Sequence, residues 1–425
     1  MKKRFETYFT KNGTTILWVM CAIAAIVGIG YLLVHPPPPG AGETVSWWGI
    51  AVNLSRGYGY SLCNQYYFPF CNTVNTPTAM REAAPVLLFS GIAHITNESL
   101  LAACLLELLL YIGVMVVVFH LAREQAGPFA GLIAATLWAL YPRAISLVPQ
   151  LSGDLLAALS VTFGILFIQR ARKSNQTRDW IFSGLGLGLA ILSRSAMLVV
   201  ALTVIAGLVI ERWNLRRPLA DWLRPSLLIL LVVASILTPW LVRTKLVFGR
   251  ALIGSSLVGY NIYRQNYMLG SSDYFRNVGT DEGWQAIQSL LARRTDLTGR
   301  ENEAQMDLVY RDEGLKIIAA NPVHYVLLSG YRFFMLWLDW RVSEAFGYQM
   351  GFKEYAMMVV QAVLMVLAFL GLRGRWKEMW PLWASLVMLT LAYMAVNSRL
   401  HYIVPVMPLV ISLGAGWIAN RFHGE

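Results

Sequence analysis

The segment Glu43-Thr-Val-Ser-Trp-Trp-Gly-Ile-Ala51 follows the first long apolar run of the chain and continues through Asn53-Leu-Ser-Arg-Gly-Tyr-Gly-Tyr60. Further along, Thr78-Ala-Met-Arg-Glu82 adds an arginine and a second carboxylate. Charged and aromatic residues therefore gather just beyond a hydrophobic segment long enough to cross a bilayer. In a chain made mostly of hydrocarbon-compatible residues, we expect chemistry at this loop.

The composition indicates an integral membrane protein. Hydrophobic residues make up 56% of the chain and charged residues only 14%, and the mean hydropathy is +0.52. These values are typical of polytopic membrane proteins and not of water-soluble domains. The net charge of +11 does not indicate nucleic acid binding, because the basic residues collect at the ends of apolar runs.

Apolar stretches near the length of about 20 residues needed to cross a bilayer predict about ten spans. They lie at 15–35, 100–121, 128–148, 151–169, 180–193, 195–211, 225–243, 352–372, 379–396 and 400–420. Two further apolar stretches, 85–97 and 324–341, are short or interrupted, and we expect them at the outer interface. The predicted fold is therefore an all-α polytopic membrane protein with about 10–12 transmembrane helices.

The placement of lysine and arginine orients these spans. Basic clusters fall on one side of the membrane in this count: residues 2–11, 170–178, 212–224 and 373–377. Since cytoplasmic loops carry the excess of Lys and Arg, both termini are predicted to be cytoplasmic. The first apolar run lacks a small-residue cleavage site and leads to a run of prolines, so we expect it to be retained as a span.

Two long segments, 36–99 and 244–351, lie on the opposite side, and we treat 1–425 as one membrane domain. The first segment contains Cys63 and Cys71, for which a disulfide in an oxidising compartment and two reduced thiols are both open. Cys21 and Cys104 lie in predicted spans, where we expect them to pack as small apolar residues.

Three carboxylates are candidates for catalysis. Glu43 precedes a segment in which Trp47, Ile50, Ala51 and Leu54 recur at helical spacing, so it is predicted to begin a short interfacial helix. Its alternative role is that of an acid favoured by the helix dipole. Glu82 follows Arg81, and Asp154 lies at the outer end of a span, where an ionisable group is a functional candidate by default.

Several arginines recur at the same outer level, and they predict a site for an anion. They are Arg143, Arg194, Arg243 and Arg399, the last followed by His401 and Tyr402. A single arginine at such a position usually anchors a helix at the interface. Four of them from different helices, opposite several carboxylates, favour a pocket for a phosphate, which Arg binds through paired hydrogen bonds.

The order of these motifs resembles that of the membrane glycosyltransferases of the C-type fold (GT-C), in particular the group of protein O-mannosyltransferases and lipid A aminoarabinose transferases. The group's spacing of an acid, an aromatic residue four positions on and an alanine four positions further is matched by Glu43, Trp47 and Ala51. Thr78-Ala-Met-Arg-Glu82 is similar to its Thr-Ala-x-Arg-Glu-Pro element, with alanine in place of proline.

Further matches cover most of the chain. They are Leu192-Ser-Arg194, Thr238-Pro-Trp240 with Arg243, Asn302-Glu303 with Asp307, Asn321-Pro322 with Tyr325, and His401-Tyr402 with Pro405 and Pro408. The chain departs from the group at its leading acid, which is usually Asp and here is Glu43, and at Trp47, where the group has tyrosine. The departures leave open a shifted substrate, another acid in the catalytic role, or a loss of activity.

The resemblance implies transfer of a sugar, with inversion, from a polyprenyl-phosphate donor to a lipid, glycan or protein acceptor. The active site is expected to face the periplasm or cell exterior from a bacterial inner membrane. Glu43 would be the base, and Glu82 or Asp154 the second carboxylate. The residues implied for the donor phosphate are Arg81, Arg194, Arg243, Arg399 and His401. Tyr58, Tyr60 and Tyr402 would line the sugar site, although aromatics at this depth are often interfacial belt residues.

The sequence contains no cluster of His, Cys or paired acids at metal-ligand spacing, so we expect a metal-independent reaction without a cofactor. The segment from Asn302 to Lys316 predicts an amphipathic helix, either a lid over the site or a scaffold. Other functions remain open: a flippase or transporter for lipid-linked glycans, a polysaccharide polymerase or ligase, and a catalytically silent paralogue that binds polyprenyl phosphate.

Overall fold

The computed structural model describes residues 2–37, 42–214, 219–275, 280–340 and 350–424. In these residues the chain is built from helices, and its strand pairing is limited to an isolated bridge between Ser61 and Pro77. Helices satisfy every backbone N–H and C=O group within one segment, as a bilayer without water requires. The predicted all-α architecture of a polytopic membrane protein is confirmed.

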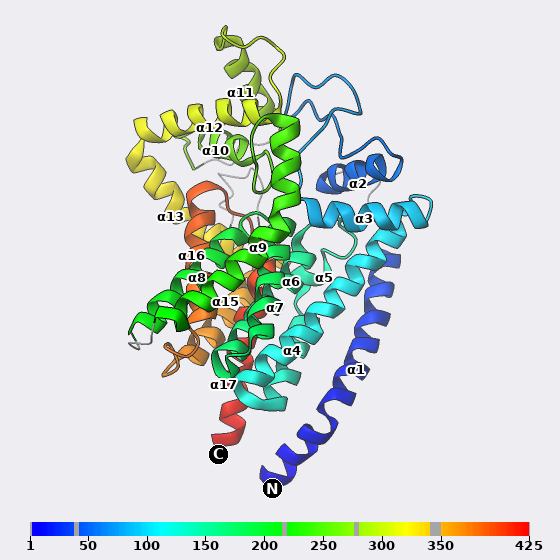
Figure 1. The fold of residues 1–425 in the computed structure, drawn as a ribbon, viewed down its shortest axis with the longest axis vertical. Helices are drawn as coiled ribbons and strands as arrows, with labels where there is room; N and C mark the ends of the chain where they lie inside the picture. The colour runs from blue at the N-terminus through cyan, green and yellow to red at the C-terminus, as the bar shows by residue number, and fades with distance from the viewer. Residues whose placement is uncertain (1, 38–41, 215–218, 276–279, 341–349, 425) are drawn as a thin grey trace.

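Seven of the described helices are long and apolar enough to cross a membrane. They are α1 (Lys2–Val34), α4 (Leu100–Ala139), α6 (Asp154–Ser174), α8 (Met197–Asn214), α9 (Leu219–Phe248), α15 (Phe352–Leu372) and α17 (Met407–Gly424), the last preceded by the 3-10 helix η1 (Leu400–Val406). Shorter helices accompany them: α3 (Ala83–Ile95), α7 (Thr177–Ser193) and α16 (Trp380–Val396). Both termini lie at the same end of the bundle (Figure 1).

The two predicted spans at 100–121 and 128–148 are joined in α4, which is a helical hairpin. The backbone is not helical at Ala126 and Gly127, and Gly127 has a φ of +87° that glycine adopts without strain. The two arms pack side by side, because the Trp138 indole N–H donates to the Tyr111 carbonyl at 3.0 Å. The second arm is shorter than predicted, since the chain leaves the helix before Pro142.

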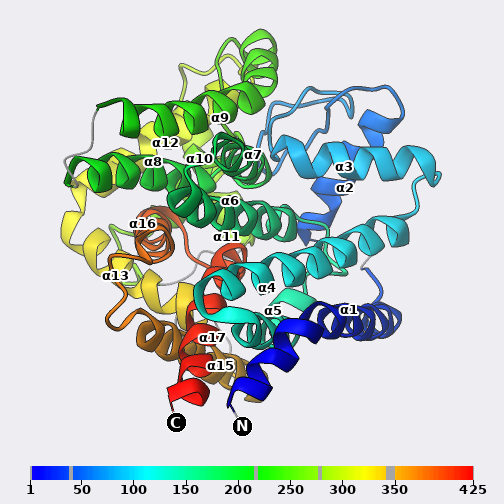
Figure 2. The same cartoon turned by 60° about the horizontal axis from the view of Figure 1, so that its bottom comes forward.

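The centre of the bundle is formed by α6 and by η1 with α17. Within their apolar windows, 78% and 83% of the residues are buried, against 28% for α1, α8 and α15. Figure 2, in which the end with the termini comes forward, shows α6 and α17 among the surrounding helices. Other parts of the protein therefore cover most residues of these central helices.

Short helices cover the end of the bundle opposite the termini (Figure 1). They are α2 (Gly42–Ser55), α3, α10 (Val258–Asn266), α11 (Thr280–Arg293), α12 (Glu303–Ala320) and α13 (Pro322–Leu338). Helices α2 and α3 lie crosswise to α1 and α4 (Figure 1), as interfacial helices do. The predicted apolar face of α2 is buried, with Trp47 at 2% exposure and Ile50 and Ala51 at 0%.

Glu303 joins three distant segments of this outer layer. Its carboxylate, 4% exposed, accepts hydrogen bonds from the Thr78 hydroxyl (2.6 Å), the Ala79 N–H (2.7 Å) and the Ser256 hydroxyl (2.7 Å). Burial raises the pKa of Glu303 to about 7, although these three donors oppose the shift. We refer to Glu303 with Thr78, Ala79 and Ser256 as the Glu303 clasp. It supports the scaffold interpretation of α12.

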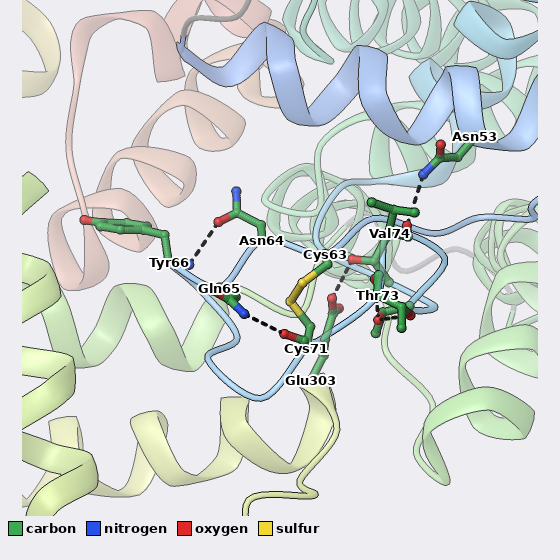
Figure 3. Close-up of a disulfide and its surroundings, with 11 residues drawn as sticks. Asn53, Cys63, Asn64, Gln65, Tyr66, Cys71, Thr73, Val74 and Glu303 are labelled. Carbon is green, nitrogen blue, oxygen red and sulfur yellow. Dashed lines mark hydrogen bonds between the residues drawn. A yellow bond between two sulfur atoms is a disulfide. The ribbon is translucent and has the colours of Figure 1, made fainter.

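The loop that precedes Thr78 is closed by a disulfide between Cys63 and Cys71, whose Cα atoms are 5.4 Å apart (Figure 3). Inside it, Gln65 donates its side-chain N–H to the Cys71 carbonyl at 3.0 Å. The loop rests on the outer helices, since the Tyr310 hydroxyl of α12 donates to the Tyr67 carbonyl at 3.2 Å. The segment that leads to Arg81 is thus held at both ends. The disulfide loop, residues 63–71, holds its beginning, and the Glu303 clasp holds its end at residues 78 and 79.

Replacing Glu303 tests the clasp. Glu303→Ala leaves the buried Ala79 N–H without an acceptor, which costs about 1–3 kcal/mol for that group alone. Glu303→Gln keeps an acceptor oxygen and the shape of the side chain. We expect the alanine variant to lower the thermal unfolding midpoint, measured by fluorescence in detergent, by several degrees, and the glutamine variant to stay close to wild type. Equal losses in both variants would contradict the clasp.

Candidate active site

Glu43 lies in the first turn of α2, where cations from other parts of the chain surround it. Its Oε2 is 3.6 Å from an Arg81 Nη1, and 51% of its side-chain surface is exposed. Although half of this surface is exposed, desolvation by the surrounding protein would by itself raise the pKa of Glu43, but the charges of Arg81, His401, Arg194 and Arg399 lower it to about 2. Glu43 is therefore ionised at physiological pH and open to an incoming group.

Arg81 is held in place by α2 and by the backbone of its own loop. Its Nε donates to the Ser46 hydroxyl at 2.8 Å, and its guanidinium lies 5.3 Å from the centroid of the Trp47 ring. The Tyr60 hydroxyl donates to the Arg81 carbonyl at 2.7 Å. With the Glu303 clasp two residues upstream, these contacts fix the guanidinium beside Glu43.

Asp154 is committed to an ion pair at the outer end of α6. Its side chain is 2% exposed and pairs with the guanidinium of Arg194, at the end of α7. Gly153 allows this approach, because a Cβ there would lie 2.1 Å from the Ser193 carbonyl oxygen. Arg194 lies 4.7 Å from the Tyr402 ring centroid, so Asp154, Arg194 and Tyr402 form one packed column.

The side chains of Glu82 and Arg243 both form hydrogen bonds with backbone groups of other segments. Glu82, 8% exposed, accepts hydrogen bonds from the Ser195 N–H at 3.1 Å and its hydroxyl at 3.0 Å. Arg243 donates to the Tyr60 carbonyl at 2.9 Å, and its guanidinium lies 4.7 Å from the Tyr60 ring centroid. Their side chains thus connect the segment from Tyr60 to Glu82 with Ser195, which follows α7, and with α9.

Arg143 and Arg399 differ from the other arginines of the site. Within the described part of the chain, neither guanidinium has a hydrogen bond or an ion pair. Arg143 lies on the short α5 (Pro142–Ile145), and its charge acts on both Asp154 and His401. Arg399 is exposed, immediately before η1. Arg399 acts on Glu43 and Arg143 on its neighbour His401, so both cations belong to the region around the site.

The structure brings together Glu43, Arg81, Asp154, Arg194, Arg399, His401 and Tyr402, which are distant in sequence. Among the residues that the structure describes, Tyr58 makes no hydrogen bond or ring contact with this group, and it is 53% exposed. The described residues contain no cluster of His, Cys, Asp and Glu that could hold a metal ion. The site is therefore a group of arginines around one open carboxylate.

Glu107 is a residue of this region that the sequence interpretation did not include. It is fully buried in α4. Its Oε1 accepts the Ser152 N–H at 3.1 Å, and the Ser152 hydroxyl accepts the Asp154 N–H at 3.2 Å. Glu107 thereby supports the turn that carries Asp154. An acid inside an apolar span is the signal that could have identified it.

One family model matches the chain. Residues 84–242 match the model of dolichyl-phosphate-mannose-protein mannosyltransferases. This stretch runs from α3 into α9 and contains Asp154 and Arg194, but it lies after Glu43 and before Arg399. No curated protein matches the chain.

Solved structures resemble the chain over nearly its whole length. The oligosaccharyltransferase of Archaeoglobus fulgidus, tethered to an acceptor peptide with the NVT sequon, is 15% identical with a TM-score of 0.59, covering 98% of this chain and 51% of that one. AglB from Archaeoglobus fulgidus, in complex with an inhibitory peptide and a dolichol-phosphate, is 14% identical with a TM-score of 0.57, covering 97% and 51%.

ArnT from Cupriavidus metallidurans, in the apo state, is 12% identical with a TM-score of 0.41, covering 97% of this chain and 78% of that one. The chain spans about half the length of the two oligosaccharyltransferase chains. Their likeness shows a shared fold, the GT-C fold of membrane glycosyltransferases that the sequence predicts.

Proposed function

We propose that the protein is an inverting glycosyltransferase that moves a sugar from a polyprenyl-phosphate donor to an acceptor hydroxyl. In this reaction the acceptor oxygen attacks the anomeric carbon and the bond from that carbon to the phosphate oxygen breaks. The acceptor proton passes to Glu43, and the polyprenyl phosphate leaves with the electron pair of the broken bond. The GT-C fold and the match to the mannosyltransferase family model support this proposal.

The observation that carries the proposal is the open, ionised carboxylate of Glu43. Of the three acids considered for catalysis, Asp154 and Glu82 are buried and engaged by Arg194 and Ser195, respectively. Only Glu43 of these three keeps half of its side-chain surface open. A base must reach the proton that it accepts, so accessibility favours Glu43 and gives the other two positioning roles.

The donor phosphate is proposed to bind Arg143 and Arg399, with His401 beside them. Arg81, Arg194 and Arg243 already make hydrogen bonds or an ion pair within the protein, whereas these two guanidinium groups make none with the residues that the structure describes. Arginine matches the geometry of phosphate oxygens. Two free cations can also stabilise the second negative charge that the phosphate acquires as it leaves.

Donor binding is proposed to activate the base. With a pKa of about 2, Glu43 is a weak base in the empty site. The arginines that lower this pKa include Arg399, which is also assigned to the phosphate. A bound phosphate brings negative charge to the same cations, opposes their effect on Glu43 and so raises its pKa. Glu43 becomes a stronger base only when the donor is in place.

Sugar transfer by the purified protein tests the proposal. Nanodiscs would receive a panel of radiolabelled polyprenyl-phosphate monosaccharides, with lipids, glycans and proteins of the source cells as acceptors. We expect Glu43→Gln to lower transfer by about a hundredfold or more, the scale of a lost general base, while binding of polyprenyl phosphate remains. Arg143→Gln and Arg399→Gln should weaken donor binding about tenfold or more each.

Glu98→Gln is the matched control, because Glu98 also lies in the outer layer but pairs with the exposed Arg56. It should transfer sugar as well as wild type does. Transfer that survives Glu43→Gln would remove Glu43 as the base. Binding of polyprenyl phosphate without transfer from any donor would favour a flippase or a silent paralogue.

The pH dependence of transfer tests the activation of Glu43. The profile of kcat/KM reports the free enzyme and that of kcat the donor complex. Because phosphate favours the protonated form of Glu43, kcat should fall as the pH is lowered at a higher pH than kcat/KM does. The profile of kcat/KM should stay flat down to the lowest pH at which the protein remains folded. Profiles of kcat and kcat/KM that coincide from pH 4 to 8 would contradict this coupling.

A further inference from the structure

A second polar site lies at the end of the bundle that carries the termini, far from Glu43. A cavity of about 270 Å³ lies there between the ends of α6 and α8, the kink region of α4 and the loop before α16. Its lining includes six charged side chains: Glu124, Arg172, Lys173, Glu211, Arg212 and Glu378. The proposed transfer reaction uses none of them.

The three acids of this cavity are already neutralised by arginines. Glu124 accepts from Arg170 at 3.0 Å, and Glu378 lies 3.2 Å from the Nε of Arg375. Glu211 pairs with Arg172, whose guanidinium also donates to the Glu378 carbonyl at 2.7 Å. No negative charge in the lining is left for a cationic ligand.

Two cations of the lining have no compensating carboxylate among the described residues. Lys173 donates its ammonium to the Glu124 backbone carbonyl at 3.0 Å, which is a neutral acceptor. Arg212 has no ion pair or side-chain hydrogen bond among the residues that the structure describes. Cations at the C-terminal ends of helices offset the helix dipole, but that role does not require a cavity between them.

We propose that this cavity binds the phosphate group of an anionic phospholipid through Lys173 and Arg212. Basic pockets between transmembrane helices bind such headgroups, and arginine and lysine both form charge-assisted hydrogen bonds with phosphate oxygens. The cavity lies where transmembrane helices end, so a headgroup can enter with its acyl chains along the bundle. This inference is independent of the proposed transferase function.

Thermal stability of the purified full-length chain tests the site. The additives would be dioleoyl phosphatidylglycerol, dioleoyl phosphatidylcholine and inorganic phosphate, each titrated in detergent. We expect phosphatidylglycerol to raise the unfolding midpoint saturably and phosphatidylcholine to leave it unchanged. In Lys173→Gln/Arg212→Gln the concentration for half-maximal stabilisation should rise about tenfold or more, as expected for two lost charge-assisted hydrogen bonds.

Arg373→Gln/Lys377→Gln is the matched control, since it removes the same charge from exposed residues of the neighbouring loop that do not line the cavity. It should respond to phosphatidylglycerol as wild type does. If inorganic phosphate raises the unfolding midpoint saturably, and only the cavity variant loses this response, then the ligand is free phosphate and not the phosphate group of a lipid. Equal responses to both lipids, or equal losses in both double variants, would overturn the site.

Discussion

Glu303 holds together the layer on which the candidate site is built. Its buried carboxylate receives hydrogen bonds from residues 78, 79 and 256, so a helix late in the chain fixes a loop early in it. Arg81 follows two residues later and lies against Ser46 and Trp47 of α2. The position of Glu43 relative to Arg399, which precedes η1, and Arg194, which follows α7, therefore depends on a contact that spans more than half of the sequence.

The arginines of the site divide into two groups by their contacts. Arg81, Arg194 and Arg243 are bound to protein atoms and hold the architecture of the site. Arg143 and Arg399 have no such contacts in the described part of the chain. In the first group, removing Asp154 would leave the buried charge of Arg194 uncompensated, which is strongly destabilising. The second group can bind a ligand without breaking a contact within the described part of the protein, and we assign the donor phosphate to it for this reason.

The sequence predicts the helices well because a bilayer imposes one length and one pattern on a span. It also predicts the apolar face of α2, since Trp47, Ile50 and Ala51 recur at helical spacing. It does not predict where the second arm of α4 ends, because the apolar run continues past Ala139 while the backbone leaves the helix. Hydropathy carries no information about that change.

The chemistry of the site is less readable from the sequence. Arg243 and Arg143 both follow proline-containing motifs at the outer level, and only the fold decides that Arg243 bonds to Tyr60 while the guanidinium of Arg143 makes no hydrogen bond or ion pair with the described residues. The burial of Asp154 likewise depends on the approach of α7, which Gly153 permits. The sequence predicts a helix that contains Glu303, but the partners of its carboxylate lie up to 225 residues away. Long-range partners of this kind are set by packing and not by local pattern.

A structure of the protein with polyprenyl phosphate bound in a nanodisc, determined by electron cryomicroscopy, tests the central claim most directly. The account predicts that the phosphate oxygens contact the guanidinium groups of Arg143 and Arg399, next to the Glu43 carboxylate, while the Asp154–Arg194 pair stays intact. A phosphate bound elsewhere, or one that displaces Asp154 from Arg194 and leaves Arg143 and Arg399 free, would contradict it.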